Sequence, residues 1–516
     1  MPPAGKNDRI FLIVAIALVA ASMAYWFAFS INEYYTFHTY IDLAHFSYDM
    51  YYHVTYPSVV HGLQYLSFGQ HLAPDQLLVL PVFYLYQSGL TLLLIQAAVL
   101  SLTGLLVFFV ARKLVGSGPV ALLLCIAYLV SPGMHGMLFY DYHAEFIIIP
   151  VVLLTFYSIM EGRRLLFLVS LLLLLGSIEA AAFVAFALGM GILLYESIYE
   201  AGKTSAERRQ RMILAAVAVA ASLAAGAAYM YATSLLSAAY AGGAYHGLPP
   251  QLELRNFASQ EIPGAGSLGG ARADHSPVAL PYAVYGLAVV FVGFGISAFL
   301  IPEVTLMLTL PWLFEGFVAG DGAFFLIWYQ YFGFVLGGMI VAVVLSFMAI
   351  RNGTSRFGVL VRRDLGWEPT RRRLFQAAVF SIILIELLAP IFIIDNPNLN
   401  LAQSFLFQTP AGQEAQIRQL YSVMKLIPQN ASVAAPIFAT SQLASRREVI
   451  PIAYVGQSLW FTPQYLLVDL NSSLGAPPAI MDQVAFDDGV MGLGSYRLLA
   501  VNGSAELYKL SVNQSG

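Results

Sequence analysis

Three ionisable residues alternate in the stretch MLFYDYHAEFIIIP, residues 137–150: Asp141, His143 and Glu145. In an extended segment the i, i+2, i+4 spacing places all three side chains on one face. A carboxylate can deprotonate a hydroxyl, and carboxylates together with histidine can hold a divalent cation. The alternative is that Asp141 caps the helix that follows, with Glu145 in its first turn, which leaves His143 without a role.

Other residues of the same chemical types lie elsewhere in the chain. Asp42 occurs in TYIDLAHFSYDM, and Asp49 follows two helical turns later on a similar face. His71 lies in FGQHLAPDQLL, and Glu179 lies in LLLLLGSIEAAAF, where a carboxylate should be paired, coordinated or facing water. The alternative for Asp42 and Asp49 is the polar face of a helix at a membrane interface. The sequence contains no P-loop, HExxH or dinucleotide-binding motif.

The chain that surrounds these residues is strongly apolar. Of its 516 residues, 59% are hydrophobic and 10% are charged, and the mean hydropathy is +0.72. Because about a quarter of the residues of a soluble domain are charged, this composition predicts a polytopic protein of the lipid bilayer. Cys125 is the one cysteine, which excludes internal disulfides and a cysteine zinc site. No nucleic-acid partner is expected.

Apolar runs of about twenty residues recur, which is the length that crosses a bilayer as a helix. We predict eleven spans, of which 164–177 and 303–317 are short enough to be tilted, broken or only partly spanning. The predicted spans are residues 10–30, 88–110, 118–131, 146–160, 164–177, 180–197, 212–234, 279–299, 303–317, 328–349 and 374–394.

Positive charge is distributed unevenly around these spans. With the N terminus in the cytoplasm, 17 of the 25 Lys and Arg fall in cytoplasmic segments and 2 in the outer loops between helices. Because cytoplasmic loops carry the excess of Lys and Arg, this partition predicts a multi-pass plasma-membrane protein with a cytoplasmic N terminus. All nine histidines fall in predicted outer loops. They either suit the interface, as amphipathic side chains do, or mark a titratable or metal-binding site at the outer face.

The predicted spans divide the chain into two domains. Residues 1–394 form an all-α membrane domain with two long outer loops, 31–87 and 235–278. Residues 395–516 are expected to form a small extracytoplasmic α/β domain, because helical and strand-like patterns alternate there. A helix is expected in AGQEAQIRQLYSVMKLIP, strands in ASVAAP, EVIPIA and QYLLVDL, and a hairpin in YRLLAVNGSAELYKL.

The order of several motifs resembles a known family of prokaryotic polytopic membrane proteins, domain of unknown function 2079. The resemblance covers most of residues 35–470 and includes YIDLAHF, FGQHLAP, SPGMHGMLFYDYHAE, the IEAA turn, IPQNASVAAPIFATSQLASRRE and QYLLVDL. The sequence departs from the family at Ile178-Glu179-Ala180, which more usually is Lys-Glu-Asp. A mechanism that needs that cation and second acid is therefore not implied here.

The architecture of this family is similar to that of the C-type glycosyltransferases, whose first outer loop carries an essential acid and whose donors are usually polyprenyl-phosphate sugars. The resemblance implies that Asp42 matches this acid, in an enzyme that transfers a hexosyl or pentosyl group to an acceptor at the outer face. Asp42, Glu145 and Glu179 are then the expected catalytic residues. The expected substrate-binding residues are His71, Asp141, His143, Arg255, Arg272 and Arg446. A divalent cation, Mg²⁺ or Mn²⁺, is the cofactor considered, with Asp42 and His143 as ligands.

The alternative function is a non-catalytic transporter or scaffold of the cell envelope with an unknown ligand. It explains the many helices but not the acids and histidines gathered outside, since a transporter more naturally places ionisable groups at mid-membrane. The lipid phosphate of a sugar donor, in turn, needs a cation or hydrogen-bond donors. Arg255 and Arg272 are the cations of the outer loops, and Arg446 would have to fold back from the tail. This scarcity weighs against the enzyme unless a metal neutralises the phosphate.

Overall fold

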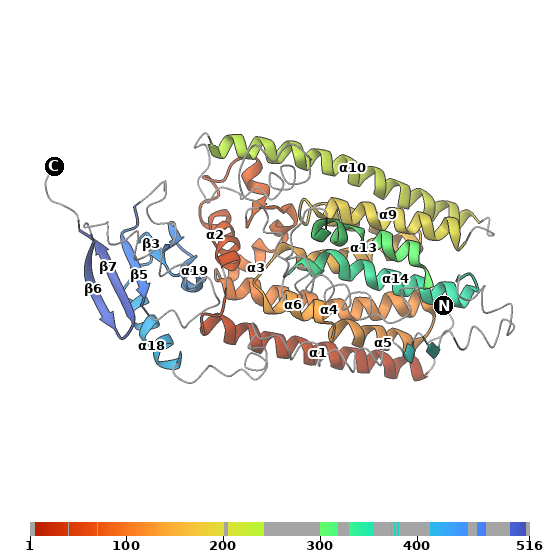
Figure 1. Cartoon of the computed structure of the whole chain (residues 1–516), viewed down its shortest axis with the longest axis horizontal. Coiled ribbons are helices and arrows are strands. Elements are labelled where there is room, and N and C mark those ends of the chain that lie inside the picture. The colour runs from red at the N-terminus through yellow and green to blue at the C-terminus, as the bar shows by residue number, and fades with distance from the viewer. Residues whose placement is uncertain are drawn as a thin grey trace.

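The computed structural model consists of a long helical body with a small mixed domain at one end (Figure 1). We call this small domain the tail domain, and the end of the helical body that faces it the tail end. The N terminus lies toward the opposite end. The structure describes residues 6–39, 41–69, 71–200, 205–241, 300–317, 330–355, 413–452, 462–470 and 496–511, and a few positions between 373 and 380.

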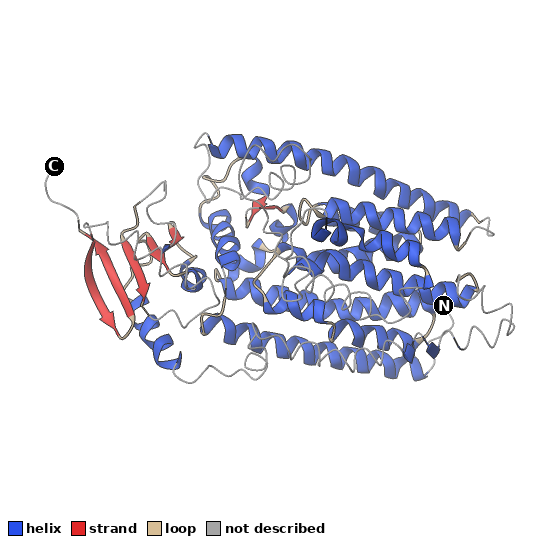
Figure 2. Ribbon diagram, viewed as in Figure 1, coloured by secondary structure: helices blue, strands red, loops and turns tan. Residues whose placement is uncertain are grey.

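Long apolar helices make up the helical body (Figure 2). Their termini follow local rules, as in α4, where the Ser88 side chain accepts a hydrogen bond from the N–H of Leu90 and Gly116 ends the helix at φ 81°. The helices are α1 (Lys6–Tyr35), α4 (Gly89–Val115), α5 (Gly118–Leu129), α6 (Pro132–Phe139), α7 (Ile148–Met160), α8 (Arg164–Leu175), α9 (Ala181–Ile198), α10 (Ala206–Ala241), α13 (Pro302–Phe317) and α14 (Gly333–Asn352).

Nine of the eleven predicted spans coincide with helices of the described residues. The other two, 279–299 and most of 374–394, lie outside the part of the chain that the structure describes. Among the residues that the structure describes, six helical segments are long and apolar enough to cross a membrane, so the predicted total of eleven is not confirmed. The expectation that the run 164–177 is short is confirmed, since α8 has 12 residues.

α14 lies at the centre of the helical body, and every residue from Gly333 to Ile350 is buried. Close approach to its neighbours depends on glycine. A Cβ at Gly338 would lie 2.5 Å from the carbonyl oxygen of Leu308 on α13, and a Cβ at Gly337 would lie 3.2 Å from the side chain of Val152 on α7. Small residues let helix backbones pack closely where lipid supplies no hydrophobic drive for association.

The first predicted outer loop, 31–87, is folded along most of its length. The amphipathic stretch after α1 forms a helix that crosses the tail end, and a two-stranded hairpin and short helical turns follow it (Figure 1). These elements are α2 (Ile41–Thr55), η1 (Gly62–Leu66), β1 (Ser67–Phe68), β2 (His71–Leu72), η2 (Pro74–Leu78) and α3 (Leu80–Leu85).

In the residues that the structure describes, the tail domain consists of a five-stranded mixed sheet and two helices. The strand order is β4-β3-β5-β7-β6, in which β3 is parallel to both β4 and β5, and β7 is antiparallel to β5 and β6. The predicted helix, the three predicted strands and the hairpin around Gly503 (φ 61°) are confirmed. The elements are α18 (Gln413–Met424), β3 (Val433–Ala435), α19 (Ile437–Leu443), β4 (Val449–Pro451), β5 (Tyr465–Asp469), β6 (Tyr496–Asn502) and β7 (Ala505–Leu510).

The tail domain rests on α2 and on the turn that precedes it. Phe37, in the turn between α1 and α2, packs in the core of the tail domain. The centroid of its ring lies 4.6 Å from that of the Tyr421 ring. The Thr39 and Ser441 hydroxyls lie 2.8 Å apart, and the Tyr48 hydroxyl donates to the carbonyl of Arg447 at 2.9 Å. One side of α2 therefore faces the tail domain. The boundary at residue 395 stays a prediction, because residues 381–412 lie outside the described ranges.

Ion pairs hold the opposite end of the helical body together. The Glu196 carboxylate on α9 is fully buried and contacts Arg211 and Arg208 of α10. Lys113 at the end of α4 lies 2.9 Å from Glu161, which follows α7. A buried carboxylate of this kind is tolerated only when a partner compensates its charge.

Candidate functional site

The N terminus of α2 brings Asp42 to the segment that follows α6. The N–H of Leu43 donates to Asp141 Oδ2 at 3.0 Å, so Asp141 caps α2 from 98 residues away. This differs from the local capping considered from sequence, in which Asp141 would cap the helix that follows it. The residue before the next helical turn is His143, whose backbone is extended (φ −139°, ψ 144°). The extended stretch lets the side chains of this segment reach the site.

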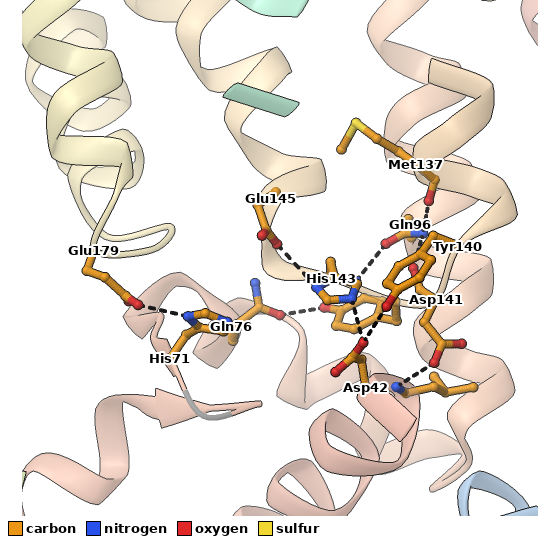
Figure 3. Close-up of polar contacts among 12 residues, drawn as sticks. Asp42, His71, Gln76, Gln96, Met137, Tyr140, Asp141, His143, Glu145 and Glu179 are labelled. Atoms are coloured by element: carbon orange, nitrogen blue, oxygen red, sulfur yellow. Dashed lines mark hydrogen bonds and ion pairs between the residues drawn. The ribbon is translucent and has the colours of Figure 1, made fainter. Parts of the chain in front are cut away.

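Asp42, His143 and Glu145 form a linear array of acid, imidazole and acid (Figure 3). His143 Nε2 lies 3.3 Å from Asp42 Oδ2, and His143 Nδ1 lies 3.6 Å from Glu145 Oε2. The Tyr140 hydroxyl donates to the same Asp42 Oδ2 at 3.1 Å. The exposed fractions of the side chains are 29% for Asp42, 6% for His143 and 2% for Glu145. Asp42 is thus the accessible end of a buried array.

The electrostatics of the array favour a charged pair. Burial opposes the ionisation of Asp42, but the His143 charge and the hydrogen bonds from His143 and Tyr140 outweigh it and lower the Asp42 pKa to about 2. Burial also opposes the protonation of His143, but the two flanking carboxylates raise the His143 pKa to about 10. At neutral pH, Asp42 is therefore a carboxylate and His143 an imidazolium.

Gln96 on α4 holds the backbone of this segment in place. Its Nε2 donates to the carbonyls of Met137 (2.9 Å) and Asp141 (3.0 Å), and its Oε1 accepts from the N–H of His143 (3.0 Å). Gln96 is 2% exposed. Buried backbone groups need such partners where a helix is interrupted. One amide side chain therefore fixes the positions of both Asp141 and His143.

A second carboxylate–histidine contact lies beside the array. His71 Nδ1 of β2 lies 2.8 Å from Glu179 Oε1, and the N–H of Leu72 donates to Glu179 Oε2 at 3.2 Å (Figure 3). Both side chains are 12% exposed. Glu179 precedes α9, and both of its carboxylate oxygens contact β2. The charge of His71 is close enough to act on Glu145, which links the two clusters electrostatically.

The structure thus brings together, at the tail end, six of the residues singled out from the sequence: Asp42, His71, Asp141, His143, Glu145 and Glu179. Arg446 does not join them, because the residue is 4% exposed and its guanidinium donates to backbone carbonyls within the tail domain, those of Leu443, Pro428 and Ala431. Arg255 and Arg272 lie outside the described residues.

Three contributors were missed from sequence. His45 lies one turn after Asp42 on α2, close enough that the charges of Asp42, His143 and His71 all affect its pKa. Burial lowers the pKa of His45, so its ring is neutral at pH 7 and can both donate and accept hydrogen bonds. The helical spacing from Asp42 would have indicated His45. Gln96 gave no comparable signal, since it lies in an apolar run, and the sequence does not distinguish Tyr140 from Tyr142 two residues later.

The two predicted metal ligands, Asp42 and His143, contact each other, with His143 Nε2 3.3 Å from Asp42 Oδ2. The other ring nitrogen of His143 faces Glu145. In the part of the chain that the structure describes, no group of three or more His, Cys, Asp or Glu could hold a metal ion. The divalent cation stays a prediction, and no chemical step below depends on it.

Fold and site together define a polytopic membrane protein with a polar cluster at one end of its helical body. The family described as "Predicted membrane protein (DUF2079)" matches residues 18–257 and 275–493, which is most of the chain. The chain therefore belongs to this family. A search of curated proteins finds no match.

Proposed function

We propose that this protein is a glycosyltransferase that moves a sugar from a polyprenyl-phosphate donor to an acceptor hydroxyl at the outer face of the plasma membrane. The observation that carries the proposal is the Asp42–His143–Glu145 array, in which an accessible carboxylate is held by a buried imidazolium. His143 and Tyr140 both contact Oδ2, which leaves Oδ1 as the Asp42 oxygen that a substrate hydroxyl can approach.

The proposed step breaks the bond between the anomeric carbon and the phosphate oxygen, and the lipid phosphate leaves with the electron pair. The acceptor oxygen forms the new bond to the anomeric carbon, and its proton goes to Asp42. A carboxylate with a pKa of about 2 is a weak base toward an unreacted hydroxyl. The acceptor oxygen becomes strongly acidic once it bonds to carbon, so the proton moves late and a weak base suffices.

The charge of the array also suits the transition state. Glycosyl transfer passes through an oxocarbenium-like state that carries positive charge on the sugar. Asp42 is fixed as an anion before the sugar arrives, so it stabilises that charge without rearrangement. His71 is the proposed contact for the donor, His143 holds Asp42, Asp141 positions α2, and Glu179 orients His71.

The leaving phosphate needs positive charge or hydrogen-bond donors. No Lys or Arg occurs in α2, in the β1–β2 hairpin or in the segments 131–147 and 176–181. Arg255 and Arg272 of the second long outer loop, or a divalent cation, remain the proposed partners of the phosphate. If neither serves, a non-catalytic transporter or scaffold with a ligand that carries no phosphate becomes the better account.

The test uses the full chain in lipid nanodiscs with a panel of radiolabelled polyprenyl-phosphate sugars. We expect transfer by the wild type, a loss of at least a hundredfold in kcat for Asp42→Asn, and a wild-type rate for Glu161→Gln, an acid at the opposite end. Transfer at the wild-type rate by Asp42→Asn refutes the role of Asp42. Flux of the intact donor across a vesicle membrane without transfer supports the transporter instead.

A further inference from the structure

The β1–β2 hairpin contains His71 but is too short to be stable by itself. Each strand has two residues, and the pairs are Ser67 with Leu72 and Phe68 with His71. Isolated hairpins are marginal even when they are longer. The position of His71 must therefore be set by contacts from outside the hairpin. Glu179 supplies these on one side, through the His71 ring and the N–H of Leu72.

α2 supplies the contacts on the other side, and Asp49 is the polar one. Asp49 Oδ2 accepts a hydrogen bond from the N–H of Gly69, in the hairpin turn, at 2.8 Å. Gly69 has φ 57°, and a Cβ there would lie 2.3 Å from the ring of Phe46 on α2. His53 stacks on Phe68 with ring centroids 4.3 Å apart. The turn is thus seated on one face of α2 by an acid and two rings.

The same helix carries the accessible acid of the proposed site. Asp42 and Asp49 are two turns apart, or roughly 10 Å along the helix axis. Asp42 meets the His143 array, and Asp49 meets the hairpin that bears His71. A rigid helix that contacts both clusters keeps a fixed distance between them.

We propose that Asp49 is a positioning residue that locks the β1–β2 hairpin to α2 and thereby sets His71 at a fixed distance from Asp42. Asp49 itself touches no substrate in this scheme. The link to catalysis rests on the proposed function, but the lock is a property of the chain alone. Burial raises the pKa of Asp49 to about 7, which shows that placing a carboxyl here costs free energy. An apolar residue would avoid that cost but would leave the Gly69 N–H without this partner.

The experiment measures opening of the hairpin directly. Cys125 is buried and is the one cysteine of the chain, so a Ser67→Cys variant reports exposure of β1 through its rate of reaction with a maleimide. Ser67 is 7% exposed, so reaction requires the hairpin to move. In this background we expect Asp49→Ala to raise the reaction rate at least tenfold. Asp49→Asn keeps an acceptor oxygen for the Gly69 N–H and should stay within about threefold of the parent.

Glu161→Ala in the same background is the control, since Glu161 is an acid at the opposite end of the helical body, and it should leave the rate unchanged. If Asp49→Ala does not fold, Gly69→Ala must give the same rise, because its Cβ displaces the turn from Phe46. Equal rates for Asp49→Ala and Asp49→Asn, or no rise in any variant, overturn the proposal. Labelling needs no substrate, so this outcome is independent of the transferase. Where transfer is measurable, Asp49→Ala should raise the KM for the donor, and Asp49→Asn should restore it.

Discussion

Replacement of His143 by glutamine removes the positive charge that lies between Asp42 and Glu145. The rise of the His143 pKa from 6.5 to about 10 corresponds to roughly 5 kcal/mol in favour of the imidazolium. Removal of one partner from a buried ion pair costs about 3–5 kcal/mol, because the remaining charge is left uncompensated. We therefore expect His143→Gln to destabilise the protein by about 3–5 kcal/mol at neutral pH, which lowers Tm by on the order of 5 °C.

The pH dependence of this difference gives the sharper assay. The folded pKa of His143 is above its unfolded value, so its stabilising contribution is complete below about pH 6.5 and is lost as the pH rises toward 10. The Asp42 pKa is depressed, so the Asp42 contribution is complete above about pH 4 and is lost as the pH falls toward 2. The Tm difference between wild type and His143→Gln should thus be largest near pH 5–6 and shrink steadily between pH 7 and 10.

His135→Gln is the matched control, since His135 also lies half-buried in the helical body but its Nε2 contacts the carbonyl of Leu129. It should show no comparable shrinkage of the Tm difference between pH 7 and 10. Thermal unfolding would be followed in nanodiscs at fixed ionic strength. A Tm difference for His143→Gln that does not change between pH 6 and pH 10 would show that His143 is not held as an imidazolium, and the electrostatic account of the site would fail.

Three other substitutions test the supporting structure. Gln96→Leu leaves three buried backbone groups without their partner and should cost roughly 3 kcal/mol by thermal unfolding, whereas Ser101→Ala on the same helix should be nearly neutral. Asp141→Ala uncaps α2, which should cost about 0.5–2 kcal/mol and speed hydrogen exchange in its first turn, while Asp141→Asn should restore protection. Arg211→Ala leaves the buried Glu196 carboxylate with Arg208 alone, 3.8 Å away, and should lower the unfolding free energy by less than the about 3–5 kcal/mol of a fully broken buried pair, yet the donor KM should not change because the site lies at the other end.

The sequence patterns predicted the tail domain and most helices because each depends on local information. Strands such as β5 (Tyr465–Asp469) are apolar along most of their length, and the β6–β7 turn contains Gly503 at the position that has a positive φ. The apolar spans follow from hydropathy alone. The fold within residues 31–87 was not predicted, because its two-residue strands are formed by contacts with α2 and Glu179 rather than by their own pattern.

For the site, the sequence indicated which acids and histidines matter but not how they pair. The spacing of Asp141, His143 and Glu145 placed them on one face, whereas in the structure Asp141 turns to α2 and the other two face each other. The partners of Asp141 and His143 on α2, which are Leu43 and Asp42, lie about a hundred positions away in the chain, and no local pattern encodes such contacts. Gln96 was missed for the same reason, since one amide in an apolar helix gives no signal until the interrupted backbone beside it is seen.

The long-range cap on α2 also imposes an order on biogenesis. Asp141 follows Leu43 by 98 residues, and Glu179 follows His71 by 108. At 5–20 residues per second, the ribosome supplies each partner roughly 5–20 s after the residue that needs it. During that interval α2 lacks its cap from Asp141, and the hairpin lacks its contacts from Glu179. The polar cluster therefore cannot assemble while the first helices insert, and a chain whose synthesis stops before Glu179 carries Asp42 but lacks the His71 contact.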